Sequence, residues 1–140
     1  MVDQISVFLE NETGGLADVV AVLARSAIDI RALALADETD FGILRLIVND
    51  TERATGALKE AGFTVRKTPV VAVQIPDRPG GLAATLDALR GVDVEYMYAF
   101  VQKSGEQALV VFRFEDAEKA VETLRRAGAK ILDARDVQEL

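Results

Sequence analysis

The sequence predicts an α+β protein made of two consecutive βαββαβ units, and three observations support this fold class. The 140-residue chain matches itself when it is shifted by 66 positions, which places Gly14 on Gly80. Strand-like and helix-like hydrophobic spacings follow one another in the same order in both copies. A Gly-Gly pair stands at the same place twice, in "LENETGGLADVVAVL" (9–23) and "IPDRPGGLAATLDAL" (75–89). A repeat this extended indicates duplication of one unit of about 65 to 70 residues.

The repeat extends well beyond the glycine pairs. The segments "RATGALKEAGFTV" (53–65) and "KAVETLRRAGAKI" (119–131) align at the same offset. Between the blocks the second copy lacks two residues, so "IDI" (28–30) aligns with "VDV" (92–94). We therefore expect a first unit over 1–68 and a second over 69–140. Pro69 cannot continue a central strand ladder, so we expect it to separate the last strand of the first unit from the first strand of the second.

Each unit begins with an apolar strand, a turn and an amphipathic helix. The strands are "QISVFL" (4–9) and "VVAVQI" (70–75). Leucines and valines then recur at helical spacing after each glycine pair, which predicts a helix. The helical positions are Leu16, Val19, Val20 and Leu23 in the first copy and Leu82, Leu86 and Leu89 in the second.

Two extended segments, a helix and a short strand complete each unit. The extended segments are 28–36 and 41–48, and 92–102 and 107–114, with the polar turns "DETD" and "KSGE" between them. Asp50 and Asp116 are suited to cap the second helices, and Gly62 and Gly128 are suited to end them in the left-handed conformation. The last strands are "FTVRK" and "KILDA". The resulting order is that of the ferredoxin-like fold, an antiparallel sheet with two helices on one face.

The third strands predict that the two units pack against each other. "GILRLIV" and "ALVVFRF" are nearly continuous apolar runs, which suit a sheet covered on both faces. We expect Leu33, Leu35 and Met97 to contribute to the second buried face. The cover could come from the other unit or from a second chain, and we expect a homodimer. Side-by-side pairing would also remove unpaired sheet edges.

The composition excludes several classes of function. The chain contains no cysteine and no histidine, which removes disulfides, thiolate nucleophiles, most zinc sites and the commonest general base. The net charge of −7 disfavours a nucleic-acid partner. The N-terminus has no signal-like leader and no apolar run is long enough to span a bilayer, so we expect a cytoplasmic protein with no membrane contact. We expect no cofactor, no metal and no catalytic residue.

The strand-to-helix turns are the candidate ligand sites. Glycine permits a positive φ and a close approach of another group, and the opening N–H groups of a helix have no partner within it. These groups, near Gly15, Leu16 and Ala17 or their counterparts, are suited to bind a carboxylate. Phosphate fits the same physics, but no P-loop lysine is near. Alternatively, the glycines only shape the turn.

Two aspartates recur at the start of the second strand of each unit. Asp29 and Asp93 stand inside apolar triplets, at a position that we expect to lie beside the loop of the first helix. A carboxylate there could accept hydrogen bonds from an ammonium group while the helix N-terminus holds a carboxylate, and together they would recognise an α-amino acid. The alternative role is that of a solvated strand end.

These motifs resemble those of the ACT domain, a regulatory amino-acid-binding module. The ACT turn typically reads Asn or Asp, any residue, Pro, Gly, any residue, Leu. The second copy matches it through Asp77, Pro79, Gly80 and Leu82, whereas Thr13 replaces the proline in the first copy. The resemblance covers the whole chain, which we expect to be a stand-alone protein made of two ACT domains in tandem. The segment "LENETGGLADVVAVLARSAIDIRAL" is also similar to the first ACT domain of acetolactate synthase small subunits, where an asparagine stands at the position of Asp29.

The resemblance implies a ligand at an interface between ACT units, held by the turn of one unit and the strands of another. Neighbours such as Leu33, Tyr96, Met97 and Tyr98 would then set selectivity, although large apolar strand residues are more often core. The ligand-binding residues that it implies are Asn11, Gly14, Gly15, Leu16 and Asp29 in the first unit and Asp77, Gly80, Gly81, Leu82 and Asp93 in the second.

Three functions are compatible with these residues. The first is a non-catalytic regulator that binds a free amino acid and modulates a partner by favouring one packing of the units. The second is a structural or interaction subunit of an amino-acid-metabolism enzyme, with no ligand of its own. The third is a small enzyme with Asp29 or Asp93 as a base, which the lack of histidine, cysteine and a carboxylate cluster disfavours.

Overall fold

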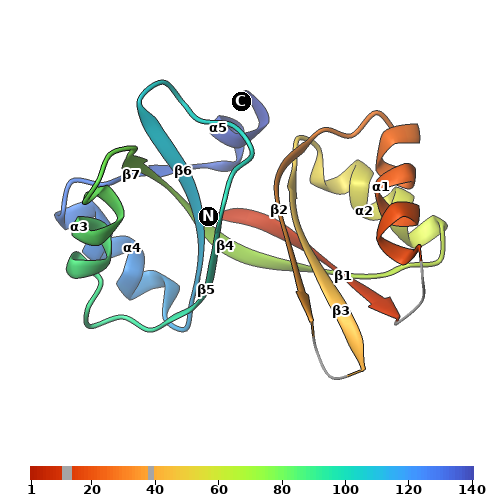
Figure 1. The fold of residues 1–140 in the computed structure, drawn as a ribbon, viewed down its shortest axis with the longest axis horizontal. Coiled ribbons are helices and arrows are strands. Elements are labelled where there is room, and N and C mark those ends of the chain that lie inside the picture. Colours follow the sequence, from red (N-terminus) through yellow and green to blue (C-terminus); the bar gives the residue numbers. More distant parts are fainter. Residues whose placement is uncertain (11–13, 38–39) are drawn as a thin grey trace.

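A computed structural model describes residues 1–10, 14–37 and 40–140, and the predicted order of elements occurs twice in it (Figure 1). The first unit contains β1 (Val2–Glu10), α1 (Gly15–Arg25), β2 (Ile30–Asp37), β3 (Phe41–Val48) and α2 (Thr51–Glu60). The second contains α3 (Gly81–Ala88), β5 (Val94–Ala99), β6 (Gln107–Phe114), α4 (Ala117–Arg126) and β7 (Lys130–Leu132). A long strand, β4 (Thr64–Pro76), belongs to both units, and a short helix, α5 (Ala134–Gln138), follows β7.

The continuity of β4 differs from the two strands predicted on either side of Pro69. The strand pairs with β1 as far as Val70 and with β6 from Val71 onward. Pro69 therefore lies where β4 still has β1 as its only partner, and a proline is tolerated in a strand at such an unpaired edge. Its carbonyl oxygen accepts a hydrogen bond of 2.8 Å from Nη1 of Arg113.

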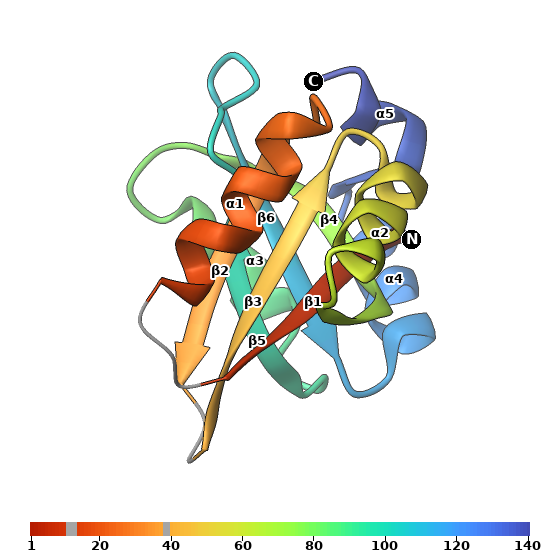
Figure 2. The same cartoon turned by 90° about the vertical axis from the view of Figure 1, so that its right-hand side faces the viewer.

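The strands form one curled antiparallel sheet in the order β2-β3-β1-β4-β6-β5, with β7 paired to β4. The two ends of this order meet, because an isolated bridge joins Ala32 of β2 to Phe100 just beyond β5. The helices α1 and α2 cover one outer side and α3 and α4 the other (Figures 1 and 2). The inner faces of the two half-sheets therefore pack against each other within one chain.

A core of apolar side chains fills the space between the half-sheets. It includes Ile47 of β3 and Val111 of β6, so the prediction that the third strands are covered on both faces is confirmed. The expectation for Leu33, Leu35 and Met97 is wrong, because these side chains are 42%, 54% and 37% exposed. The full inner core consists of Val2, Ala32, Ile47, Val70, Ala72, Phe100, Leu109, Val111, Leu132 and Val137.

A register irregularity in each edge strand explains that error. In β2 the register shifts between Ile30 and Ala32, and in β5 it shifts between residues 94 and 96. A β-bulge of this kind reverses the faces on which the following side chains lie. Leu33 consequently pairs with Leu46 on the helix-covered side, whereas Ala32 faces the inner core.

The helix caps agree with the sequence analysis. The side chains of Asp50 and Asp116 each accept a hydrogen bond of 3.1 Å from the backbone N–H three residues later. Gly62 and Gly128 follow the second helices with φ values of 95° and 80°, the left-handed conformation that glycine adopts without strain. The second helix of each unit is therefore delimited by local sequence alone.

The helix α5 was not predicted, since it lies after the last repeated strand. Asp133 and Asp136 form a capping box, in which each side chain accepts a hydrogen bond from the other's backbone N–H, at 2.8 and 2.9 Å. Val137 is 2% exposed and belongs to the inner core. The helix therefore closes one end of the space between the half-sheets.

We expect the docking of α5 to weaken at acidic pH. Hydrogen bonds, above all from the backbone N–H of Asp136, hold the pKa of Asp133 below its ordinary value of 3.8. The carboxylate therefore stabilises α5 above about pH 4, and this contribution is lost as the pH falls through the lower pKa of the folded state. Methyl NMR of Val137 should show α5 undocking below about pH 4 in the wild type and less so in Asp133→Asn, which can cap without titrating. Identical pH profiles would contradict this assignment.

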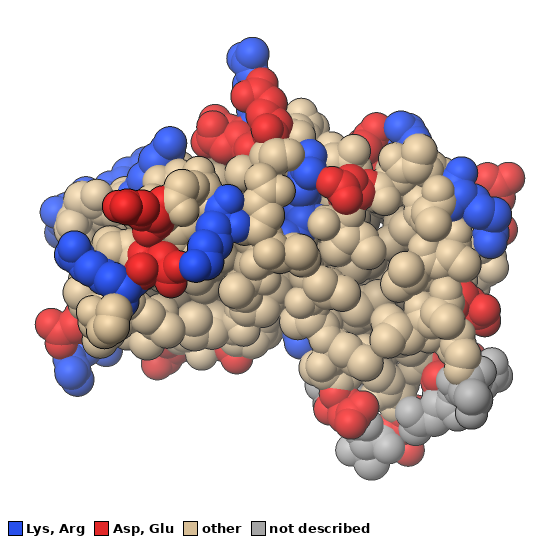
Figure 3. All heavy atoms as spheres, turned by 45° about the horizontal axis from the view of Figure 1, so that its top comes forward, with Lys and Arg blue, Asp and Glu red and all other residues tan. Residues whose placement is uncertain are grey.

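The surface carries charges of both signs. On the face drawn in Figure 3, Lys and Arg side chains are interspersed with Asp and Glu side chains over both units. Among the helices in the described part of the chain, none combines the length and apolar character needed to cross a membrane.

Candidate functional site

Both strand-to-helix turns have the same backbone geometry. Gly14 and Gly80 are the N-cap residues of α1 and α3, with φ values of 92° and 89°. An L residue is strained in this left-handed region, so glycine is required at both positions. Neither cap makes a side-chain hydrogen bond to the helix. Among the described residues, no side chain caps the first N–H groups of either helix. The Gly81 N–H donates to the carbonyl oxygen of Arg78 at 3.0 Å. This leaves the N–H groups of Leu82 and Ala83 as candidate anion donors in the second turn.

The second glycines of the two turns differ in their surroundings. A Cβ built on Gly81 would lie 2.0 Å from the carbonyl oxygen of Pro76, far inside van der Waals contact. A Cβ built on Gly15 would lie 4.0 Å from the nearest atom, the carbonyl oxygen of Glu10. Close packing of strand and helix therefore requires the glycine at 81, but not the glycine at 15.

The structure does not bring Asp29 or Asp93 next to the glycine turn of its own unit. Asp29 follows the C-terminal end of α1, whose 11 residues separate it from Gly14 by about 16 Å at 1.5 Å per residue. Its backbone exchanges hydrogen bonds with Asn49, which precedes α2. The expectation that each aspartate lies beside the glycine turn was wrong. Each aspartate lies between the first helix and the second strand, at the end of the helix that is far from the turn.

The two aspartates also differ in their partners. Nη1 of Arg31 donates to the Asp29 carboxylate at 2.5 Å. Asp93 makes no ion pair with any residue that the structure describes, and its backbone oxygen accepts from the N–H of Glu115 at 3.2 Å. Asp93 is therefore the freer of the two to accept an ammonium group.

The remaining predicted residues have mixed positions. Asn11 lies outside the described residues. Asp77 forms an ion pair with Lys103. Leu16 and Leu82 are 39% and 40% exposed on the outer sides of their helices.

Exposed apolar side chains occur on the first helix and on the second, outer strand of each unit. We call these two sets the edge patches. Their side chains come from the first helix and the second strand of the unit and are about 36% to 54% exposed. The edge patch of the first unit consists of Leu16, Val20, Leu33 and Leu35, and that of the second of Leu82, Leu86 and Met97.

Tyr96 and Tyr98 lie between the units rather than at a turn. Their rings stack with centroids 6.5 Å apart, and the guanidinium of Arg45 lies 3.8 Å from the centre of the Tyr96 ring. Fully buried Gln4 donates to the Tyr96 hydroxyl at 2.8 Å and accepts from the Tyr98 hydroxyl at 2.6 Å. Burial raises the pKa of Tyr98 above its ordinary range, so the phenol remains a donor. These tyrosines connect the two half-sheets.

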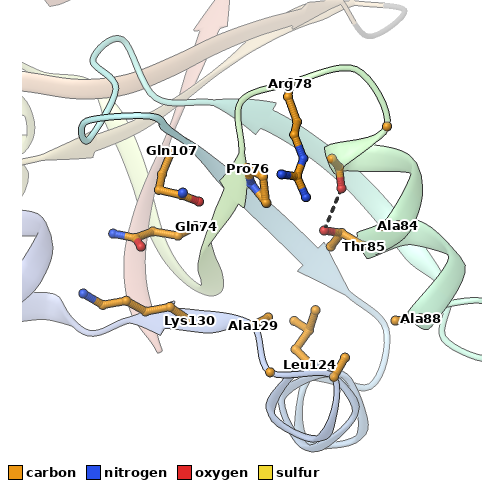
Figure 4. A pocket seen from close by; sticks show the side chains of 14 residues that line it. Gln74, Pro76, Arg78, Ala84, Thr85, Ala88, Gln107, Leu124, Ala129 and Lys130 are labelled. Atoms are coloured by element: carbon orange, nitrogen blue, oxygen red, sulfur yellow. Dashed lines mark hydrogen bonds between the residues drawn. The ribbon is translucent and has the colours of Figure 1, made fainter.

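A cavity of about 480 Å³ opens beside the glycine turn of the second unit (Figure 4). It lies between the end of β4, the start of α3 and the segment between α4 and β7. Sequence analysis did not single out its polar side chains, although comparison of the two copies at these positions would have shown that they differ. Those side chains are Gln74, Arg78, Thr85, Gln107 and Lys130.

Two βαββαβ units with paired glycine turns define the chain as a tandem domain of the ACT type. The chain belongs to the ACT domain pair family, which matches residues 1–140. It is similar to the crystal structure of protein BT0572 from Bacteroides thetaiotaomicron, with 42% identity, a TM-score of 0.91 and coverage of 99% of this chain and 96% of that one.

Other solved structures share the fold. The ligand-free regulatory subunit of aspartate kinase from Thermus thermophilus has 20% identity and a TM-score of 0.62, over 89% of this chain and 91% of that one. The corresponding subunit from Thermus flavus has 19% identity and a TM-score of 0.58, with the same coverage. A search of curated proteins gave no match.

Proposed function

We propose that the protein is a non-catalytic regulator that binds a free amino acid at its glycine turns and modulates a partner. The observation that carries this proposal is the pair of left-handed glycine N-caps in an ACT domain pair. Regulatory subunits of aspartate kinase share the fold, which supports an enzyme of amino-acid metabolism as the partner.

The ligand interface that this proposal needs lies between two chains. The turns begin α1 and α3 on opposite sides of the molecule, away from the inner core (Figure 1). The edge patches flank the turns and have no partner in the described part of the chain. Large exposed apolar patches mark interaction sites, and a second copy is the simplest cover.

A two-fold axis between copies would also bring the separated residues together. In such a dimer, α1 of one copy runs antiparallel to α1 of the other, so the Gly14 end of one lies near the Asp29 end of its partner. The carboxylate and ammonium groups of one amino acid could then be held by different chains. Gly80 and Asp93 would need a separate contact through the second unit, because α3 lies on the opposite side of the molecule from α1 (Figure 1).

Replacing Leu35 with glutamate should dissociate the dimer. Leu35 is 54% exposed in the edge patch of the first unit, so the change leaves the core of a single chain intact. Burying an unpaired carboxylate against apolar side chains is costly, so the variant should be monomeric at micromolar concentration. The measurement is light scattering coupled to size exclusion. Val101→Glu, at a site 67% exposed outside the patch, is the control and should leave the wild-type mass unchanged. A monomeric wild type, or a Leu35→Glu dimer, would contradict the interface.

Calorimetric titration with each of the twenty amino acids tests the ligand. We expect at least one to bind at millimolar concentration or better, and Gly14→Ala or Gly80→Ala to weaken binding at its own turn at least tenfold. Gly62→Ala is a matched control, because Gly62 has a φ of 95° and, like Gly14, no atom within 4 Å of an added Cβ. If Gly62→Ala lost as much affinity for the amino acid as Gly14→Ala, backbone strain rather than the turn itself would explain the loss.

The edge patches also favour a second candidate, an interaction subunit that binds a partner protein and no amino acid. This candidate predicts that Leu35→Glu abolishes partner binding while no amino acid gives a calorimetric signal. Binding of an amino acid by the purified protein would exclude it.

A further inference from the structure

The cavity of the second unit is lined by cations and amides without any acid. Its polar side chains are those of Gln74, Arg78, Thr85, Gln107 and Lys130, and neither Asp nor Glu is among the lining residues. Within the described part of the chain, Arg78 and Lys130 form no ion pair. Figure 4 shows the Arg78 guanidinium directed toward Thr85, with Gln107, Gln74 and Lys130 in a row across from it and the Lys130 ammonium group extending away from Arg78. The cavity has a volume of about 480 Å³, within the range of about 300–1,000 Å³ typical of small-molecule sites.

The equivalent place in the first unit has the opposite character. A smaller cavity of about 220 Å³ lies there, lined by Glu10 and Asp18 and by the aromatic ring of Phe8. At the offset of 66 residues, Glu10 corresponds to Pro76, Asp18 to Ala84 and Phe8 to Gln74. In the sequence, Glu12 stands where the second unit has Arg78. The two units thus share their fold here but differ in side chains. The acids and the aromatic ring of the first unit are replaced in the second by a cation, an amide and small residues.

We propose that the cavity of the second unit binds a small anion bearing a carboxylate or a phosphate, and that the first unit does not. The Arg78 guanidinium supplies paired N–H donors that match either group, and Lys130 supplies a second positive charge. Gln74 and Gln107 offer amide donors at the same opening. The absence of a lining carboxylate removes the repulsion that Glu10 and Asp18 would exert.

This site shares Gly80 and Gly81 with the second turn of the proposed amino-acid site and extends from there along one side of α3. The cavity is lined by Ala84, Thr85 and Ala88 of α3, whereas the edge patch uses Leu82 and Leu86 on another side of the same helix. An anion can therefore bind to a single chain without a second copy. Because the second turn is shared, this inference rests in part on the regulator proposal, and two variants keep their failures apart. Arg78→Gln tests the cavity of the second unit, whereas Gly14→Ala tests amino-acid binding at the first turn, which is not part of this cavity.

NMR titration of the ¹⁵N-labelled full chain tests the anion site. The probes are inorganic phosphate and succinate, with succinamide as the neutral control and sodium chloride at matched ionic strength. We expect one of the anions to shift the Arg78 Nε–H and Gly81 amide signals saturably, while the Gly15 amide does not move. Phosphate alone or succinate alone would identify which group the cavity prefers, and either result supports the site.

Three variants assign the effect to the cavity. Arg78→Gln should weaken binding about tenfold, the effect expected for loss of one charge-assisted interaction. Lys130→Gln should weaken binding less, because its ammonium group extends away from Arg78. Arg125→Gln, which removes the same charge from an exposed site outside the cavity, should leave the affinity unchanged. Ala84→Asp, which introduces the acid of the first unit, should abolish binding while circular dichroism confirms the fold. The proposal would be overturned if neither anion gave saturable shifts at concentrations up to about 20 mM. It would also be overturned if Arg125→Gln weakened anion binding as much as Arg78→Gln.

Discussion

Replacing Gly81 with alanine should lower the free energy of unfolding by about 3 kcal/mol, whereas Gly15→Ala should change it by less than about 1 kcal/mol. The reason is the position of the added Cβ, which would lie 2.0 Å from the Pro76 carbonyl oxygen in one case and 4.0 Å from Glu10 in the other. Both residues begin a helix and neither has a positive φ, so the pair isolates steric overlap from backbone strain. Urea denaturation of the two variants measures the difference.

Equal stability of these two variants would show that β4 and α3 can move apart without cost. The anion titration of the Gly81→Ala protein offers an independent check, because Gly81 and Pro76 both line the cavity. We expect the affinity to fall together with the stability.

Replacing Gln4 with leucine should cost about 2–3 kcal/mol of unfolding free energy. The Gln4 side chain is fully buried and joins β1 of the first unit to β5 of the second through the hydroxyl groups of Tyr96 and Tyr98. Leucine would leave both phenols without this partner, and an unsatisfied polar group in a poorly solvated site costs about 1–3 kcal/mol. Thermal and urea denaturation measure the loss.

A triple variant separates hydrogen bonding from packing. Gln4→Leu combined with Tyr96→Phe and Tyr98→Phe removes the amide and both phenols together, and should recover most of the lost stability. The remaining loss comes from the buried Ser6 hydroxyl, which accepts a hydrogen bond of 3.1 Å from the Gln4 amide. The Tyr96→Phe ring can still stack under Arg45. If the triple variant is as unstable as Gln4→Leu, packing of the amide rather than hydrogen bonding explains the effect.

Local signals made much of the fold predictable from sequence. Asp50 and Gly62 delimit α2 because a capping side chain and a left-handed glycine act within one turn of the chain. The predicted third strand matches β3 at both ends, since its apolar run is bounded by polar turn residues on both sides. The positive φ of Gly14 and Gly80 also agrees with the turn geometry that the glycine pairs indicate.

Features that depend on pairing between distant segments could not be predicted in this way. Pro69 is compatible with a continuous β4 only because that strand changes partners beside it, and no local pattern reports this. The register shift after Ile30 reverses the faces of β2, so the alternation of Leu33 and Leu35 was assigned to the wrong side. Asp29 lies far from Gly14 because its position depends on the direction of α1.

The polar cavity was missed for a different reason. Repeats draw attention to what the two copies share, whereas the cavity depends on where they differ. Arg78 and Lys130 stand at positions where the first unit has Glu12 and Thr64. Comparison of the copies residue by residue identifies such positions once the fold shows that they surround one space.

We propose that the helix N-termini at the glycine turns hold the carboxylate of a free amino acid. The most direct test is ¹⁵N NMR of the full chain titrated with the amino acid that calorimetry identifies, read at the backbone amides of 14–17 and 80–83. We expect saturable shifts at one or both of these helix starts. The shifts should be lost for the affected turn in Gly14→Ala or Gly80→Ala and retained in Gly62→Ala. Saturable binding that leaves both segments unshifted, or no binding of any amino acid at millimolar concentration, would contradict it.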